Sequence, residues 1–186
     1  RFIKRLLATL VCFFCSKFAF SAIPDSFQLT SPAFENRGSI PSIYSRLGKN
    51  ISPPLSWTGE SHETQSFVLV VMDYDAKASE NCLYHAKGAP KCSIVHWVAY
   101  NIPKSKHQLD AGTEHLTSGL NSYDKKGYIG MNPPLGETHE YYFYVYALDI
   151  SRIHIPESSN AHDLLYAIKN HIIGKATLVG RYKKAK

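Results

Sequence analysis

Six short stretches of the sequence are rich in β-branched and aromatic residues, and this pattern restricts the chain to a mainly β fold. Segments rich in Pro, Gly, Ser and Asn separate them, as is typical of turns and loops. The predicted strands are residues 27–30, 40–46, 66–72, 94–101, 141–149 and 176–182. Many short strands in one chain favour antiparallel pairing around a common core.

One segment, residues 161–173, is predicted to be a helix. Asn160 is suited to cap its first turn, which contains Asp163, and Gly174 is expected to end it. Four apolar residues at helical spacing form the stripe expected to face the core: Leu164, Leu165, Ile168 and Ile172. A helix this late in the chain predicts an antiparallel β domain with a peripheral helix.

Residues 1–22 are predicted to be an export signal. A positively charged start precedes an apolar run at residues 6–14, and Ala19-Phe20-Ser21 is a small-x-small cleavage site. This run is too short to span a bilayer, and no later segment reaches the roughly eighteen apolar residues that a span requires. We therefore expect no transmembrane anchor, and a single domain at residues 23–186 that is exported to the periplasm or secreted.

The charge of the expected mature chain argues against nucleic-acid binding. The full sequence has a net charge of +6, but the predicted signal contains four basic residues and no acidic one. Its removal leaves 17 basic and 15 acidic residues, a balance of +2. After the predicted signal, the longest runs of Lys or Arg are the pairs Lys125-Lys126 and Lys183-Lys184. A nucleic-acid partner is therefore not expected.

Cys82 and Cys92 are the cysteines that remain after the predicted signal. They lie ten residues apart in a loop-like segment that contains Gly88 and Pro90. A disulfide between them is the favoured interpretation for an exported chain. Two free thiols are the alternative, and a metal site is less favoured because neither cysteine belongs to a CxxC pair.

The segment "VHWVAYN", residues 95–101, places an imidazole in an otherwise apolar strand. Because side chains of a regular strand alternate between its two faces, His96 is expected to share a face with Val98 and Tyr100.

Polar, titratable residues lie at the ends of three predicted strands. Asp73 and Asp75 follow the strand at 66–72, His96 opens the next, and His139 and Tyr141 lie at the start of a third. Each has an ordinary structural explanation, since Asp-x-Asp often forms a turn and a single His in a strand is usually a satisfied core residue. Their convergence at strand ends, where pockets form, favours a functional site.

Two kinds of chemistry are compatible with these residue types. Imidazole and carboxylate groups can bind zinc or iron. Alternatively, the imidazoles can donate hydrogen bonds to an anion while the carboxylates hold them in place. Because bare carboxylates repel phosphate, anion binding requires the imidazoles, the Tyr hydroxyl and backbone N–H groups to dominate. The residues alone leave both possibilities open.

Five segments occur in a fixed order along the chain: "NISPPLSW", "DYDA", "HWVAYNIP", "GYIGMNPPLGETHEYYFYVYALD" and "GKATLVGRY". In this order they resemble motifs of the phosphatidylethanolamine-binding protein family, in its bacterial Raf-kinase-inhibitor-like branch. The likeness runs from about Phe27 to Tyr182.

This resemblance implies a central antiparallel β-sheet, a second small sheet and flanking helices. It also implies a small surface cavity that accepts phosphate or the head group of a phospholipid, with no cofactor. Carried over residue by residue, the expected ligand-binding residues are Asp73, Asp75, His96, Asn132, Pro134, His139 and Tyr141.

The sequence departs from the family pattern at a few positions. Tyr74 and Lys77 stand where the family has Pro, and Met131 and Glu140 replace the usual Pro and Arg. Strand alternation predicts that Glu140 points away from the expected cavity.

The leading functional hypothesis is an exported, non-catalytic binding protein for a phosphorylated small molecule or a phospholipid head group. A second is a protein-interaction modulator, because relatives in the family are associated with kinase or protease regulation. A metal-dependent hydrolase is less favoured, since the sequence contains no nucleophile elbow, HExxH or P-loop.

Overall fold

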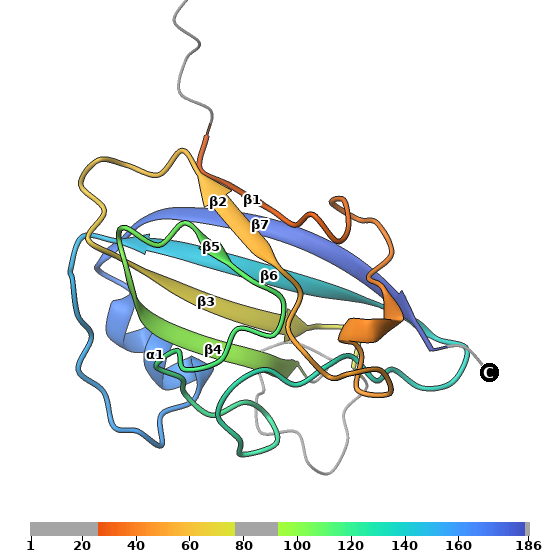
Figure 1. Ribbon diagram of the computed structural model, residues 1–186. Coiled ribbons are helices and arrows are strands. Elements are labelled where there is room, and N and C mark those ends of the chain that lie inside the picture. The colour runs from red at the N-terminus through yellow and green to blue at the C-terminus, as the bar shows by residue number, and fades with distance from the viewer. Residues whose placement is uncertain (1–25, 77–92, 185–186) are drawn as a thin grey trace, which may run out of the picture.

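The computed structural model describes residues 26–76 and 93–184, which form two antiparallel β-sheets and one α-helix (Figure 1). The larger sheet has the order β4-β3-β6-β7, with β3 at Ser66–Asp73, β4 at Ile94–Pro103, β6 at Thr138–Leu148 and β7 at Ile172–Lys183. The smaller has the order β1-β2-β5, with β1 at Gln28–Thr30, β2 at Leu55–Thr58 and β5 at Gln108–Leu109. The α-helix α1 spans Ala161–Ile168, and a 3-10 helix, η1, spans Ser42–Tyr44.

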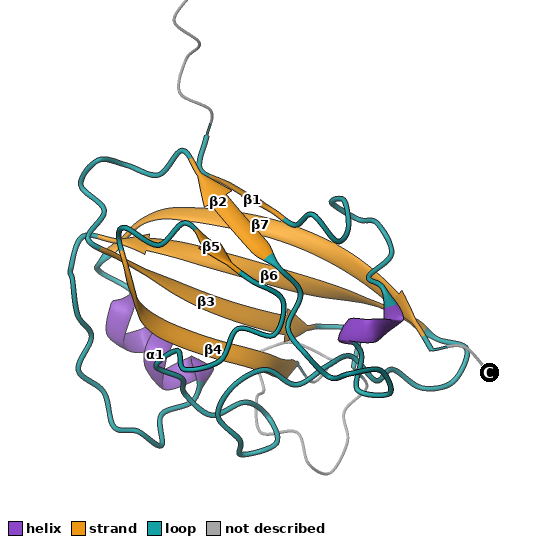
Figure 2. Ribbon diagram, in the orientation of Figure 1, coloured by secondary structure: helices purple, strands orange, loops and turns teal. Residues whose placement is uncertain are grey.

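The small sheet, the large sheet and α1 form three layers (Figure 2). One apolar cluster, which includes Trp57, Phe67 and Phe143, lies between the two sheets. A second cluster packs Leu164 and Ile168 of α1 against the opposite face of the large sheet. β3 is consequently buried at all eight positions, which explains why it is a nearly continuous apolar run rather than an alternating one.

The mainly antiparallel β fold with a second small sheet is confirmed, although the bounds of several elements differ from the sequence prediction. The expected strand at 40–46 is wrong, because this segment contains η1. Pro41 immediately precedes η1 and has no N–H to donate to a sheet ladder. The sequence analysis did not predict β2 and β5, which are only four and two residues long.

The beginning of the predicted helix is confirmed and its end is wrong. The Asn160 side chain accepts hydrogen bonds from the backbone N–H groups of His162 and Asp163, and the Asp163 side chain accepts one from the N–H of Asn160. The helix ends at Ile168, however, and Ile172 and Gly174 lie in β7 instead. Both pair with the end of β6, so sheet pairing overrides the helical spacing of the apolar residues.

Two predictions from the sequence lie outside the described residues: the export signal at 1–22 and the pair Cys82 and Cys92. Within the described ranges, the structure has no helix that is both long and apolar enough to cross a membrane.

Candidate functional site

The end of β3 and the beginnings of β4 and β6 meet at one edge of the large sheet, because β3 is antiparallel to both neighbours. Asp73, the last residue of β3, is paired with Ile94 of β4 and with Tyr141 of β6. His139 lies two residues before Tyr141, and therefore on the same face of β6. The strand register thus brings Asp73, His139 and Tyr141 together.

A β-bulge turns His96 toward this group, which corrects the face expected from the sequence. Met72 is paired with Val95 and Val71 with Trp97, so His96 is an extra residue in β4. At such a bulge the alternation of side chains is interrupted. The centre of the His96 ring lies 5.2 Å from the centre of the Tyr141 ring. Val98 and Tyr100, in contrast, belong to the apolar cluster on the helix side of the sheet.

Asp73 binds His139 and also shapes the turn after β3. Its Oδ2 lies 2.7 Å from Nδ1 of His139, and both side chains are buried. Its Oδ1 accepts hydrogen bonds from the backbone N–H groups of Asp75 and Ala76, at 2.8 and 3.2 Å. Asp73 is therefore both a turn former and the partner of an imidazole, and both of its oxygen atoms are engaged.

His96 presents an unprotonated nitrogen when its ring is neutral. Its Nδ1 lies 2.8 Å from the backbone oxygen of Ile129, and a carbonyl oxygen only accepts, so Nδ1 carries the proton. Nε2 is buried and has no hydrogen-bond partner in the part of the chain that is described. Burial lowers the pKa of His96, and the hydrogen bond to Ile129 and the charge of Asp73 only partly oppose this effect.

Tyr141 carries a second unpartnered polar atom. Its side chain is 1% exposed, and within the described residues its hydroxyl has no hydrogen-bond partner. Burial raises the pKa of Tyr141, and the negative charge of Asp73 raises it further. The hydroxyl therefore stays protonated at physiological pH and is a donor for which residues 26–76 and 93–184 supply no acceptor.

Asn132 and Pro134 are exposed and lie on the loop that leads into β6. The Asn132 side chain accepts a hydrogen bond from Nζ of Lys184 at 3.1 Å. The backbone oxygen of Pro134 accepts one from Glu137 at 3.1 Å. These two predicted residues lie on a surface loop and are not part of the buried cluster.

Sequence reasoning missed Arg46, which lies beside the same loop. Its backbone N–H donates to the oxygen of Met131, and its guanidinium lies 4.9 Å from the centre of the Tyr123 ring. Its positive charge contributes to lowering the pKa of His96. No motif identifies Arg46, because its position depends on the loop between β5 and β6.

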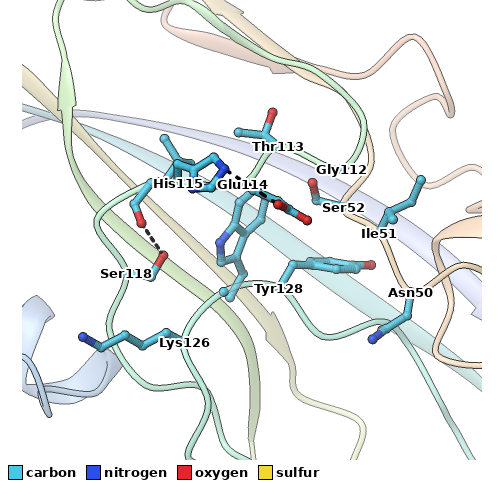
Figure 3. Close-up of a pocket in the computed structure, with 13 residues that line it drawn as sticks. Asn50, Ile51, Ser52, Gly112, Thr113, Glu114, His115, Ser118, Lys126 and Tyr128 are labelled. Carbon is cyan, nitrogen blue, oxygen red and sulfur yellow. Dashed lines mark hydrogen bonds and ion pairs between the residues drawn. The ribbon is translucent and has the colours of Figure 1, made fainter.

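The loop before β6 is also held by Asn50, the first residue of the "NISPPL" segment. Its Oδ1 accepts a hydrogen bond from the N–H of Gly130 at 2.7 Å. Asn50 also lines a cavity of about 390 Å³ near the loop (Figure 3). This cavity is lined by neither histidine of the cluster and is therefore a different feature of the surface.

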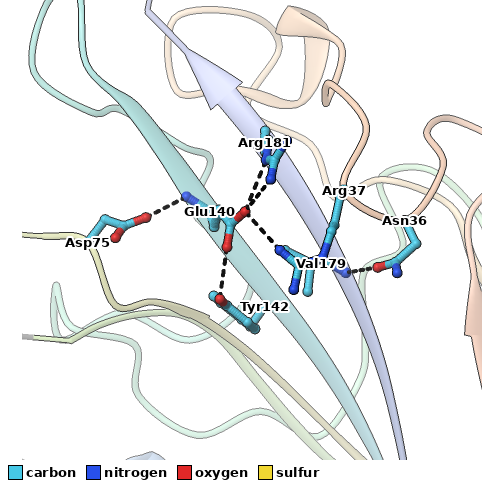
Figure 4. Close-up of polar contacts among 7 residues, drawn as sticks. All are labelled: Asn36, Arg37, Asp75, Glu140, Tyr142, Val179 and Arg181. Carbon is cyan, nitrogen blue, oxygen red and sulfur yellow. Dashed lines mark hydrogen bonds and ion pairs between the residues drawn. The ribbon is translucent and has the colours of Figure 1, made fainter.

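The carboxylate of Asp75 is bound to the backbone of β6, one residue after His139. β3 ends at Asp73, and Oδ2 of Asp75 accepts a hydrogen bond from the N–H of Glu140 (Figure 4). The Glu140 side chain is hydrogen-bonded to Arg37, Arg181 and Tyr142, so its predicted outward direction is confirmed. The hydrogen bond to Arg181, assisted by that to Tyr142, lowers the pKa of Glu140.

Within residues 26–76 and 93–184, no group of three or more His, Cys, Asp or Glu side chains is arranged to hold a metal ion. The group formed by Asp73, His96, His139 and Tyr141 is called the polar cluster below. Its neutral hydroxyl and the nearby Arg46 can donate hydrogen bonds to the oxygen atoms of an anion, and Nε2 of the neutral His96 can accept one from a protonated oxygen of the same group.

Comparisons with known proteins support the resemblance found in the sequence. A family model described as phosphatidylethanolamine-binding protein matches residues 30–183. A UPF0098 protein of Methanothermobacter thermautotrophicus is 37% identical over 164 residues, which cover 84% of this chain and 99% of the relative. A UPF0098 protein of Chlamydia trachomatis is 38% identical over 160 residues, with 84% and 99% covered.

Two crystal structures share the architecture. A putative phosphatidylethanolamine-binding protein homologue from Chlamydia trachomatis has 37% sequence identity and a TM-score of 0.75, and the match covers 86% of this chain and 98% of that one. E. coli YbcL, described as a member of the mammalian family, has 27% identity and a TM-score of 0.73, with 86% and 99% covered.

Proposed function

The chain belongs to the phosphatidylethanolamine-binding protein family, and on this basis we propose that its polar cluster binds the phosphoryl group of a small molecule or of a phospholipid head group, without catalysing a reaction.

Two buried polar atoms that have no hydrogen-bond partner among the described residues carry this proposal: the Tyr141 hydroxyl and Nε2 of His96. A buried polar group without a partner costs about 1–3 kcal/mol. The two rings are in edge contact, so one small ligand can reach both groups. A singly protonated phosphate monoester satisfies both, because its unprotonated oxygen atoms accept from Tyr141 while its P–OH group donates to Nε2 of His96; a diester, which has no P–OH, satisfies Tyr141 alone.

The charges around the cluster are compatible with an anion despite the presence of an acid. Both oxygen atoms of Asp73 are already hydrogen-bonded, and the second acid, Asp75, is turned toward Glu140. Arg46 and Lys184 supply positive charge beside the loop before β6. Glu137 is a third acid at this edge, since its Oε2 lies 3.4 Å from Nε2 of His139. Anion binding therefore depends on the Tyr141 hydroxyl and on the positive charges of Arg46 and Lys184.

An NMR titration with phosphoethanolamine and with glycerophosphoethanolamine tests the proposal. The first is a phosphate monoester and the second a diester. We expect the side-chain signals of His96 and His139 to shift with both ligands, and the shifts to saturate. Tyr141→Phe should weaken binding, whereas Tyr142→Phe should not, because Tyr142 is hydrogen-bonded to Glu140 on the other face of β6. Saturable shifts that leave both imidazoles unchanged would rule out this site.

Export is part of the same proposal and rests on the sequence of residues 1–22 alone. Expression of the full chain in a bacterial host, followed by N-terminal sequencing of the protein in each cell fraction, tests it. We expect a chain cleaved near Ser21 or Ala22 outside the cytoplasm, and an uncleaved cytoplasmic chain would contradict it.

A further inference from the structure

The cavity in Figure 3 lies among three segments that are far apart in the sequence: residues 50–52, 112–118 and 126–128. Trp97 of β4 also lines it. Its volume of about 390 Å³ is within the usual range of about 300–1,000 Å³ for small-molecule sites. None of its lining residues belongs to the polar cluster, so it is a separate candidate site.

The charged side chains around the cavity are balanced. Nζ of Lys126 lies 2.9 Å from a carboxylate oxygen of Glu157. Glu114 and His115 are both exposed, and Nε2 of His115 lies 3.9 Å from Oε2 of Glu114. Lys126 and His115 therefore offer little unpaired positive charge to an anion, and Glu114 repels one. This balance favours an uncharged ligand.

A neutral polar group and an aromatic wall complete the lining. Ser52 is 1% exposed, and in the described part of the chain its hydroxyl has no hydrogen-bond partner. A hydroxyl both donates and accepts, so it matches the hydroxyl of a ligand. The half-buried Tyr128 provides apolar surface beside it and packs edge to face on the buried Trp97, with ring centres 5.7 Å apart.

The cavity walls are tied together by hydrogen bonds. The N–H of Gly112 donates to the backbone oxygen of Ser52 at 2.9 Å, which joins two of the three segments. The Tyr128 hydroxyl donates to the backbone oxygen of Tyr44 at 2.9 Å, which fixes the aromatic wall. A ligand therefore meets a largely pre-formed site and pays little to order it.

We infer that this cavity is a second binding site. It takes an uncharged, hydroxyl-bearing molecule, a sugar or a polyol, that is about the size of a monosaccharide. Three features match this class: the Ser52 hydroxyl, which has no partner in the described ranges, the Tyr128 wall packed on Trp97, and the paired charges at the rim. The inference does not depend on phosphoryl binding at the polar cluster.

NMR titration of the protein with D-glucose and with N-acetylglucosamine tests the inference, with glycine and inorganic phosphate as charged probes. The expected result is a saturable shift of the Trp97 indole N–H and the Gly112 amide with at least one sugar, and no such shift with glycine or phosphate. No saturable shift with either sugar, or an equal response at these two groups to a charged probe, overturns the inference.

Two variants locate the binding. Ser118→Phe should fill the cavity and weaken sugar binding by about tenfold or more, a loss of about 1.4 kcal/mol. Thr117→Phe is the matched control, because Thr117 is the adjacent residue, is exposed and does not line the cavity. Equal affinity of the two variants for the sugar would contradict the assignment.

Ser52→Ala covers the case in which Ser118→Phe fails to fold. This change keeps the cavity open and removes only a hydroxyl that has no partner in the described chain, so stability should be unchanged or slightly higher. Sugar affinity should fall by about threefold to tenfold. Unchanged affinity in a folded Ser52→Ala protein would overturn the role given to this hydroxyl and, with it, the proposed site.

Discussion

Oδ2 of Asp73 lies 2.7 Å from Nδ1 of His139, and both side chains are buried between neighbouring strands. Because the carboxylate only accepts, Nδ1 of His139 carries a proton and the orientation of the ring is fixed. The other oxygen of Asp73 accepts from the turn that follows β3. One side chain therefore connects the end of β3 to the imidazole on β6.

Replacing Asp73 with Asn is expected to disturb both functions of this carboxylate. The amide oxygen can still accept from the turn, but its NH₂ group then faces the N–H of His139. The free energy of unfolding should fall by about 1–3 kcal/mol, and phosphoryl affinity should fall with it. Urea denaturation and an NMR titration measure the two effects. Asp110→Asn is the control, since Asp110 is exposed; equal losses in both variants would contradict a specific role for Asp73.

Tyr141→Phe should lower ligand affinity without lowering stability. The Tyr141 hydroxyl has no partner within the described residues, so its removal relieves a buried unsatisfied group and leaves the ring packing intact. Tyr128→Phe is the comparison, because it removes a hydrogen bond to Tyr44 and should cost about 0.5–1.5 kcal/mol. Thermal or chemical denaturation separates them. A clear loss of stability in Tyr141→Phe would mean that this hydroxyl already has a structural partner.

The strands of the large sheet could be predicted from the sequence, although with different bounds, because apolar, β-branched runs such as residues 67–72 favour buried strands. The sequence also predicted that polar residues gather at strand ends, and antiparallel pairing then places them at one edge. It did not predict the direction of His96, because a bulge depends on the register between two strands and not on residue type. Arg46 was missed for a similar reason, since its place depends on a loop contact with Met131.

In the ligand-free protein, protonation of His96 should lower the free energy of unfolding at acid pH. Burial lowers the pKa of His96 in the folded state, so the unfolded chain takes up this proton first as the pH falls below about 6.5. Above that pH both states are neutral at this position, and the residue adds no pH dependence. Below it the free energy of unfolding should decrease.

His96→Asn isolates this effect. The side-chain N–H of Asn can still donate to the backbone oxygen of Ile129, but it does not titrate. Chemical denaturation at about pH 7.5 and about pH 5.5 should therefore show a smaller loss of stability in the variant than in the wild type. The same loss in both proteins would show that other groups account for it.

Arg46→Gln should weaken phosphoryl binding by about threefold to tenfold, since it removes a positive charge beside the loop before β6. The affinity of the Arg46→Gln variant for phosphoethanolamine should also depend less on salt than that of the wild type. Calorimetric titrations with phosphoethanolamine at low and high salt measure both quantities. Arg181→Gln is the matched control because Arg181 is engaged with Glu140, and its affinity should equal that of the wild type. A greater loss of affinity in Arg181→Gln than in Arg46→Gln would contradict the role given to Arg46 in phosphoryl binding.

The decisive measurement is a crystal structure of the complex with phosphoethanolamine. Its phosphoryl oxygen atoms should lie at hydrogen-bond distance, about 2.5–3.2 Å, from both the Tyr141 hydroxyl and Nε2 of His96. A ligand bound elsewhere on the protein, with these two atoms still unpartnered or bound only to water, would contradict it.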